Sequence, residues 1–181
     1  MKYAEDGRYL RTVVFTSLFA ALTCVATLIV QIPMPVGGYM HLGDAVVLLS
    51  GWLLGPVYGV LAAAIGSMLA DLFTGYFLYV PATFVIKGLV ALVGYLVSRL
   101  LLPVVKRCRP IAYAVSGILA EAVMIGGYLL FEATLAGYGL AGALLGVPNN
   151  AMQALLGVVA GTALVTVMEK MRLTDRIHIR K

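Results

Sequence analysis

Residues 82–102 read ATFVIKGLVALVGYLVSRLLL, an apolar run with the length that a helix needs to cross a bilayer. One charged residue, Lys87, stands inside this run, well before Arg99 near its end. A charged side chain within a membrane is unfavourable and is a candidate functional residue by default. The run therefore predicts a membrane helix, and it marks Lys87 as a residue whose charge needs a partner.

The rest of the chain shares this composition. Of its 181 residues, 62% are hydrophobic and 12% are charged, whereas soluble domains carry roughly 25% charged residues. Apolar segments are predicted at 9–32, 42–54, 57–71, 82–102, 111–135 and 148–168. The second and third are short and are separated by Gly55 and Pro56, so we expect this pair to be tilted or partly re-entrant. The sequence thus predicts an all-α integral membrane protein, with residues 1–181 forming one domain of six transmembrane helices.

Positive charges give these segments an orientation. Of the 13 Lys and Arg residues, all except Lys87 flank the apolar segments at three places. They are Lys2, Arg8 and Arg11; Arg99, Lys106, Arg107 and Arg109; and Lys170, Arg172, Arg176, Arg180 and Lys181. Because such residues accumulate on the cytoplasmic side, we expect both termini and the connector 103–110 in the cytoplasm. The loops 33–41, 72–81 and 136–147 lack Lys and Arg and are expected outside, which predicts a multi-pass protein of the cell membrane.

Polar residues within the segments gather toward the predicted outer side. They are Asp44, Asp71, Lys87, Glu132, Asn149, Asn150 and Gln153, with Glu121 alone near mid-membrane. Glu121, Tyr128 and Glu132 are spaced to share one helix face. Asn149 and Gln153 share a face of the last segment with Gly157 and Gly161, where glycines allow close approach of another helix or a ligand. This pattern predicts a polar cavity open to the outside. The loop aromatics expected to cover it are Tyr39, Tyr76, Phe77, Tyr79 and Tyr138.

Structural roles compete with this interpretation. Asp71 and Lys87 fit an ion pair between neighbouring helices, and Asp44 fits the N-cap of its helix. Asn149 and Asn150 likewise fit caps of the last segment. Tyr39 and Tyr79 fit interfacial anchors as well as ligand contacts. For Glu121 the mid-membrane position favours a functional or gating role.

Enzyme motifs are missing from the sequence. It has no P-loop, no GxSxG and no HExxH, its two histidines are far apart, and its two cysteines, Cys24 and Cys108, are predicted in different compartments. No catalytic residue, metal or cofactor is therefore expected. Energy for any transport would come from an ion gradient or from a partner protein.

Six blocks of sequence resemble a known family. They are His41-Leu-Gly-Asp44, residues 54–59, residues 66–71, residues 84–88, residues 121–128 and residues 148–153. Together they resemble the substrate-binding S components of energy-coupling factor (ECF) transporters, closest to the riboflavin-type branch that includes proteins assigned to hydroxymethylpyrimidine or pyridoxine. The resemblance implies a six-helix fold, cytoplasmic termini and an outward-facing pocket. It also implies a complex with a transmembrane T component and two cytoplasmic ATPases.

The first helix of that family carries small residues that dock on the T component. Here a seam of small residues at four-residue spacing starts at Thr12, and the expected docking residues are Thr16, Ser17, Ala20, Ala21 and Cys24. Small residues at this spacing permit close helix contact. Packing of the same seam inside the subunit is the alternative.

The resemblance and the polar pattern together give an expected substrate site. It comprises Tyr39, His41, Asp44, Asp71, Tyr79, Lys87, Glu121, Tyr128, Glu132, Asn149, Asn150 and Gln153. The set contains no Arg, the residue that phosphate groups favour. We therefore expect a small neutral or weakly basic heteroaromatic ligand, such as pyridoxine or a hydroxymethylpyrimidine, with riboflavin as the alternative. A stand-alone ion-coupled carrier and a membrane-embedded enzyme are the other classes left open.

Overall fold

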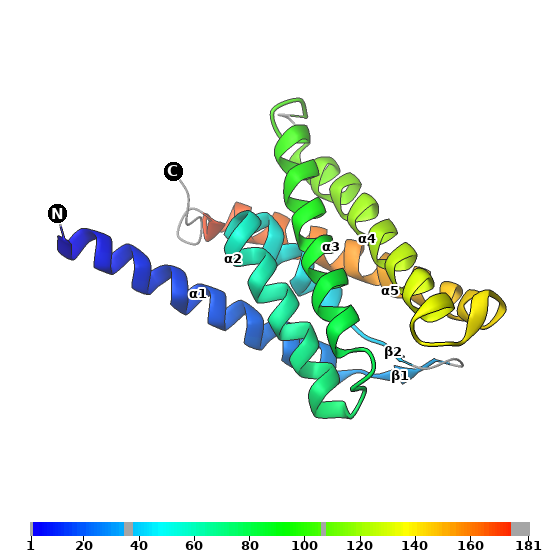
Figure 1. The fold of residues 1–181 in the computed structure, drawn as a ribbon. Coiled ribbons are helices and arrows are strands. Elements are labelled where there is room, and N and C mark those ends of the chain that lie inside the picture. Colours follow the sequence, from blue (N-terminus) through cyan, green and yellow to red (C-terminus); the bar gives the residue numbers. More distant parts are fainter. Residues whose placement is uncertain (1, 35–37, 106–107, 175–181) are drawn as a thin grey trace.

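The computed structural model describes residues 2–34, 38–105 and 108–174. Five long helices dominate these residues (Figure 1): α1 (Lys2–Ile29), α2 (Gly43–Thr74), α3 (Val80–Leu101), α4 (Arg109–Thr134) and α5 (Gly139–Lys170). Each is long and apolar enough to cross a membrane. A short antiparallel hairpin, β1 (Ile32–Pro33) and β2 (Tyr39–Met40), follows α1. Of the predicted flanking cations, Lys106, Arg107, Arg176, Arg180 and Lys181 lie outside the described residues.

A sharp break divides α2. Gly55 has φ of +86° and ψ of −169°, a backbone conformation that glycine adopts without steric cost, and Pro56 follows it. The halves 43–54 and 56–74 approach so closely that a Cβ atom at Gly59 would lie 2.2 Å from the carbonyl oxygen of Ser50. The break expected between segments two and three is therefore present. The described residues nevertheless form five helical elements of spanning length, and six separate helices are not confirmed.

The last helix begins earlier than expected. After turns at Gly137 and Gly139, both with positive φ, α5 runs from Gly139 and includes Pro148 in its interior. The prediction of a loop over 136–147 was therefore wrong for most of that segment. Proline within membrane helices is tolerated where neighbouring groups satisfy the freed backbone carbonyl. Asn149 and Asn150 consequently lie inside the helix, so the capping role proposed for them was also wrong.

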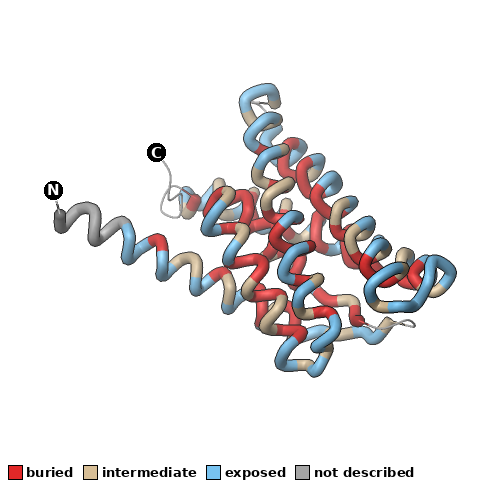
Figure 2. Tube along the Cα trace, in the orientation of Figure 1, coloured by how far each residue is buried: buried red, intermediate tan, exposed pale blue. Residues whose placement is uncertain are grey.

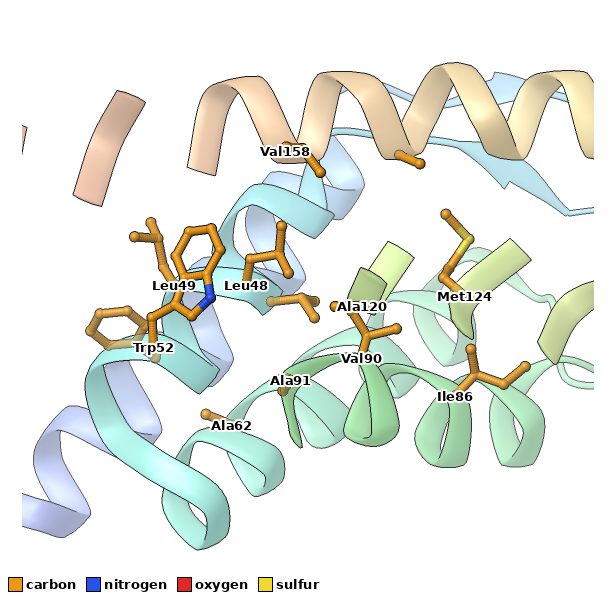
Figure 3. Packing of buried hydrophobic residues seen from close by; sticks show 14 of the residues in the cluster. Leu48, Leu49, Trp52, Ala62, Ile86, Val90, Ala91, Ala120, Met124 and Val158 are labelled. Carbon is orange, nitrogen blue, oxygen red and sulfur yellow. The ribbon is translucent and has the colours of Figure 1, made fainter. Parts of the chain in front are cut away.

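The helices pack in chain order, α1 on α2, α2 on α3, α3 on α4 and α4 on α5, and a contact between α2 and α5 closes the bundle. Buried residues line these contacts (Figure 2). Side chains at the centre include Leu48, Trp52, Val90, Ala120 and Val158 (Figure 3). α1 packs mainly on α2, and its N-terminal half extends beyond the other helices (Figure 1).

Glycines allow two of these close approaches. A Cβ atom at Gly66 would lie 2.4 Å from the Ala20 carbonyl oxygen of α1, and a Cβ atom at Gly157 would lie 2.8 Å from Cβ of Asp44. The predicted role of Gly157 in close helix contact is confirmed, and the helix that it admits is α2.

Candidate ligand-binding site

A pocket lies where the β1–β2 hairpin meets the helix ends that follow it. Its lining residues come from the hairpin segment and from α2 to α5: Met34, Gly38, Tyr39, His41, Asp71, Tyr79, Thr83, Tyr128, Glu132, Asn150 and Gln153. The space among them is about 330 Å³ including the part open to solvent, but the centre of a water molecule fits in only about 20 Å³ of it. A ring-sized ligand therefore requires side chains or the hairpin to move outward.

Most of the expected site residues meet at this pocket. Those that line it are Tyr39, His41, Asp71, Tyr79, Tyr128, Glu132, Asn150 and Gln153. Asp44, Lys87 and Glu121 are buried and do not line it. Asn149 is half-buried and lies outside the lining, because its neighbour Asn150 occupies the inward face of α5.

Aromatic rings form a belt beside the pocket, in which Tyr39, Tyr79 and Tyr128 line the cavity and Tyr76 does not. The ring centroids of Tyr39 and Tyr76 are 4.9 Å apart, those of Tyr76 and Tyr79 are 6.3 Å apart, and those of Tyr79 and Tyr128 are 6.4 Å apart. Phe77 and Tyr138, also expected to cover the cavity, are exposed and do not line the pocket. The belt offers ring faces and edges on which a flat ligand can stack.

Two carboxylates in the pocket wall are each held by a tyrosine. The Tyr39 hydroxyl donates to Oδ1 of Asp71 at 2.8 Å, and the Tyr79 hydroxyl donates to Oε1 of Glu132 at 3.2 Å. Burial, followed by the nearby carboxylate, raises the pKa of each tyrosine above its usual value of 10. Both phenols therefore stay protonated and act as donors.

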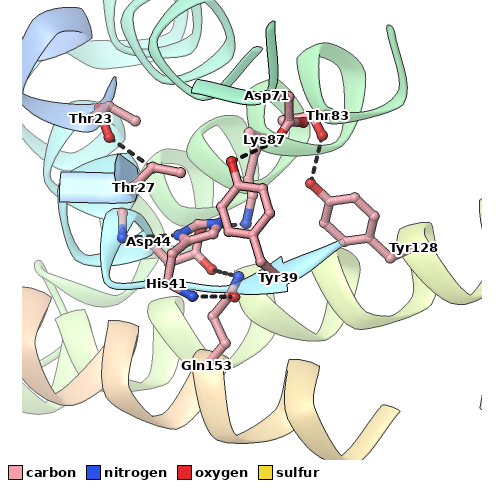
Figure 4. Close-up of polar contacts among 11 residues, drawn as sticks. Thr23, Thr27, Tyr39, His41, Asp44, Asp71, Thr83, Lys87, Tyr128 and Gln153 are labelled. Atoms are coloured by element: carbon pink, nitrogen blue, oxygen red, sulfur yellow. Dashed lines mark hydrogen bonds and ion pairs between the residues drawn. The ribbon is translucent and has the colours of Figure 1, made fainter. Parts of the chain in front are cut away.

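A second polar cluster lies beneath the pocket (Figure 4). Nζ of Lys87 lies 2.5 Å from Oδ1 of Asp44, and Nε2 of Gln153 donates to Oδ2 of Asp44 at 2.7 Å. Oε1 of Gln153 accepts from the backbone N–H of His41 at 3.0 Å. Lys87 also lies 5.4 Å from the centroid of the Tyr128 ring. The alternative pairing of Lys87 with Asp71 was therefore wrong, because among the described residues Lys87 forms its ion pair with Asp44.

His41 satisfies the start of α2. Its Nδ1 accepts a hydrogen bond of 3.0 Å from the Gly43 backbone N–H, and α2 has no side-chain cap from Asp44. The prediction that Asp44 serves as an N-cap was therefore wrong. Burial, followed by the charge of Lys87, lowers the pKa of His41 to about 4. A neutral imidazole is also what the geometry requires, because a protonated Nδ1 cannot accept the Gly43 bond.

Glu121 is the least satisfied polar residue among those described. Its side chain is 1% exposed and neither carboxylate oxygen has a hydrogen-bond partner. A Cβ atom at Gly157 would contact both Asp44 and Oε1 of Glu121. The expected shared face of Glu121, Tyr128 and Glu132 is confirmed, since all three point into the bundle.

Three lining residues were not predicted. Thr83 stands one turn before Lys87, and its hydroxyl lies 3.0 Å from that of Tyr128. This i, i+4 spacing from Lys87 was a signal that could have identified it. Met34 and Gly38 reach the pocket only because the β1–β2 hairpin folds over it, and hydropathy carries no sign of that hairpin.

The expected docking seam on α1 is divided between two faces. Ser17 and Ala21 are exposed, Thr16 and Ala20 are half-buried, and Cys24 is buried. Close packing of Gly66 against Ala20 turns that side of the seam toward α2. Of the five residues, only Ser17 and Ala21 are fully available for a partner in this structure.

Comparisons with solved structures agree on the fold. The chain is similar to the S component of a bacterial ECF transporter, with a TM-score of 0.69 and 20% identity over 92% of this chain and 98% of the other. It is also similar to the S component for biotin of an ECF-type ABC transporter, with a TM-score of 0.55 and 18% identity over 89% and 94% of the two chains. At these identities the likeness shows the S-component fold.

Sequence comparisons extend this to the family. A Pyrococcus woesei protein, described as "Uncharacterized protein in gap 3'region", is 33% identical over 154 residues, which are 81% of this chain and 93% of that protein. Residues 9–170 match the family described as "ECF-type riboflavin transporter, S component". Such S components bind a vitamin and work with a T component and ATPases, and they are not enzymes. The chain therefore belongs to the S-component family of ECF-type transporters.

Proposed function

We propose that this S component captures a small, neutral or weakly basic heteroaromatic vitamin or precursor, of the pyridoxine or hydroxymethylpyrimidine type. One observation carries the proposal. The pocket combines a belt of tyrosine rings with two carboxylates, and no Arg or Lys is among the described residues that line it. Such a wall suits a flat ring whose edge carries hydrogen-bond donors.

The charges of the pocket argue against an anionic ligand. Asp71 and Glu132 face the space directly, whereas Lys87 is held beneath it by Asp44. A phosphate group would meet two carboxylates with no exposed cation to compensate its charge. A vitamin in its free form is therefore preferred over its phosphate ester.

Riboflavin is the second candidate. The description of the matching family favours it, and its isoalloxazine ring is neutral and aromatic. It is larger than a single pyridine or pyrimidine ring, however, and the space open in this structure is narrow. Riboflavin would thus require a wider opening of the pocket than pyridoxine.

The proposal includes orientation and partners. We place both termini in the cytoplasm and the pocket at the outer face of the cell membrane, because the flanking cations then lie inside. Ligand would enter from outside and pass to a T component and two cytoplasmic ATPases, with Ser17 and Ala21 on α1 as the docking surface. Vesicle uptake that requires the ATPases supports this arrangement, and ATP-independent uptake by the single chain would point instead to an ion-coupled carrier.

Binding measurements on the purified chain test the ligand. Mass spectrometry of compounds that co-purify should detect the ring compound, and titration calorimetry should rank pyridoxine, hydroxymethylpyrimidine and riboflavin. We expect a single-ring compound to bind most tightly and its phosphate ester to bind weakly. Tighter binding of riboflavin than of both single-ring compounds would replace the first candidate with the second.

A further inference from the structure

Asp71 and Glu132 share one arrangement in the pocket wall. Each side chain is almost fully buried, at 6% and 1% exposed respectively. Each gives one oxygen to a tyrosine hydroxyl, Tyr39 for Asp71 and Tyr79 for Glu132. The second oxygen of each, Oδ2 of Asp71 and Oε2 of Glu132, has no hydrogen-bond partner among the described residues. Two buried acceptors therefore face the same pocket from different helices.

Several donors around the pocket are engaged elsewhere, and the Asn150 amide, which lies beside Oε2 of Glu132 near Gly146, makes no hydrogen bond to that oxygen. The His41 backbone N–H donates to Gln153, the Gln153 amide donates to Asp44, and Lys87 donates to Asp44. The Thr83 hydroxyl lies 3.0 Å from the Tyr128 hydroxyl, and either of the two can be the donor. It makes no hydrogen bond to Oδ2 of Asp71. Buried acceptors are rarely left unmatched, so the free oxygens indicate donors that arrive with a ligand.

The two acceptors stand at different places along the aromatic belt. Asp71 lies in the last turn of α2 and is hydrogen-bonded to Tyr39, whereas Glu132 lies near the end of α4 and is hydrogen-bonded to Tyr79. Tyr76 lies between these tyrosines, with centroid distances of 4.9 Å and 6.3 Å. A ring bound in this pocket would therefore have one carboxylate on the α2 side and one on the α4 side.

On the basis of the ligand pocket proposed above, we infer that Asp71 and Glu132 form a two-point acceptor site. It selects ring compounds that carry hydrogen-bond donors at two separate positions, such as hydroxymethyl groups, an amino group or a protonated ring nitrogen. Tyr39 and Tyr79 are positioning residues, because each fixes one carboxylate oxygen and turns the other toward the ligand. Compounds with one donor satisfy only one carboxylate and bind more weakly.

Ligand analogues combined with variants test this site. Pyridoxine and its two deoxy analogues, each lacking one hydroxymethyl oxygen, are titrated into the wild-type protein, Asp71→Ala and Glu132→Ala. We expect each analogue to bind the wild type about ten- to a hundred-fold more weakly than pyridoxine, as for loss of a hydrogen bond to a charged group. Each variant should bind pyridoxine more weakly by a similar factor. Each should also bind one of the two analogues as well as it binds pyridoxine, and this analogue should differ between the two variants.

A third tyrosine–carboxylate pair supplies matched controls. The Tyr113 hydroxyl donates to Oε1 of Glu169 at 2.7 Å, at the opposite ends of α4 and α5 from the pocket. Glu169→Ala and Tyr113→Phe should leave the affinity ratios of the three compounds unchanged. Tyr79→Phe, in contrast, should reduce the ratio of affinities between pyridoxine and the analogue that Glu132 distinguishes. If an alanine variant does not fold, Asp71→Asn and Glu132→Gln keep the side-chain shape and should reduce the same ratios in part.

The outcomes separate this inference from the proposed function. The two-point site would be overturned if the wild type bound pyridoxine and both analogues equally. It would also be overturned if the carboxylate variants kept the wild-type ratios of affinity for pyridoxine and its analogues. Either result would leave the ligand class intact. No binding of pyridoxine, hydroxymethylpyrimidine or riboflavin by folded wild-type protein would overturn the proposed ligand class, and the two-point site with it.

Discussion

Nζ of Lys87 lies 2.5 Å from Oδ1 of Asp44, and both side chains are completely buried in the helix bundle. The pair ties α3 to the first turn of α2. Gln153 adds α5 by donating to the second oxygen of Asp44. Three helices thus meet at one carboxylate directly beneath the pocket.

Breaking this pair should destabilise the protein strongly. Lys87→Met leaves the Asp44 carboxylate buried without its cation, and loss of one partner of a buried pair costs about 3–5 kcal/mol in the free energy of unfolding. The double variant Lys87→Met with Asp44→Asn should recover much of that loss, because no uncompensated charge remains. Denaturant unfolding in detergent measures both. Lys87→Met with Asp71→Asn is the control and should recover little; full recovery by that combination would show that Asp71 is the partner.

Gly157 should tolerate no side chain. A Cβ atom there would lie 2.8 Å from Cβ of Asp44, so Gly157→Ala must push α5 away from α2 at a cost of about 1–3 kcal/mol. Gly126→Ala in α4 is the matched control, because its Cβ would meet nothing within 4 Å. The control should be neutral or stabilising by up to roughly 1 kcal/mol, since alanine is the better helix former. Equal thermal stability of both variants would contradict the close α2–α5 approach.

Acid should weaken the protein through His41. Its pKa of about 4 in the folded state lies below the usual 6.5. Between these two pH values His41 is protonated in the unfolded chain and neutral in the folded chain. This contribution to stability is full above about pH 6.5 and is lost as the pH falls toward about 4, up to roughly 3 kcal/mol. The melting temperature of the wild type should therefore approach that of His41→Asn as the pH is lowered from about 7 to about 5. Parallel curves would show that His41 accepts a proton freely in the folded state.

Hydropathy was enough to predict the membrane class and most helix positions. The apolar segments identified α1, α3 and α4 to within a few residues, apart from the N-terminal end of α1. The reason is that a bilayer requires a spanning helix to have both a certain length and an apolar composition. The start of α5 was missed, because Gly-rich sequence before Pro148 is typical of a loop in water. In this bundle the same residues are helical, with the turn shifted to 137–139.

Pairings were harder to predict than the members of the site. Lys87 stood out as a cation within an apolar run, and Asp71 and Gln153 as polar residues at a similar depth in the membrane. Which carboxylate Lys87 meets depends on how α2 folds back at Gly55 and how closely Gly157 admits α5. Neither is visible in helical spacing, so the sequence offered Asp71 as the partner, and the packing was needed to identify Asp44.

The exposed face of α1 should control assembly with a T component. Ala21→Phe adds a bulky ring to an exposed small residue, so it should block complex formation while leaving thermal stability and ligand affinity nearly unchanged. Ala20→Phe should instead lower stability, because Ala20 packs against Gly66 of α2. Co-purification with the T component and ATPases measures assembly. Ile118→Phe, on the exposed face of α4 (59% exposed), is the control for added bulk. Normal assembly of Ala21→Phe would exclude this face as the docking surface.

The two ends of α4 should label from opposite sides of the membrane. Its 26 residues span about 39 Å, more than the hydrocarbon thickness of roughly 30 Å. Exposed Cys108 lies just before α4, and Gly137 lies just after it. In a Cys24→Ala background, a membrane-impermeant maleimide should modify Cys108 only after cells are permeabilised, because the cations around it favour the cytoplasm. With Cys108→Ser also present, Gly137→Cys should be labelled on intact cells. Labelling of Cys108 on intact cells would invert the orientation and place the pocket on the cytoplasmic side.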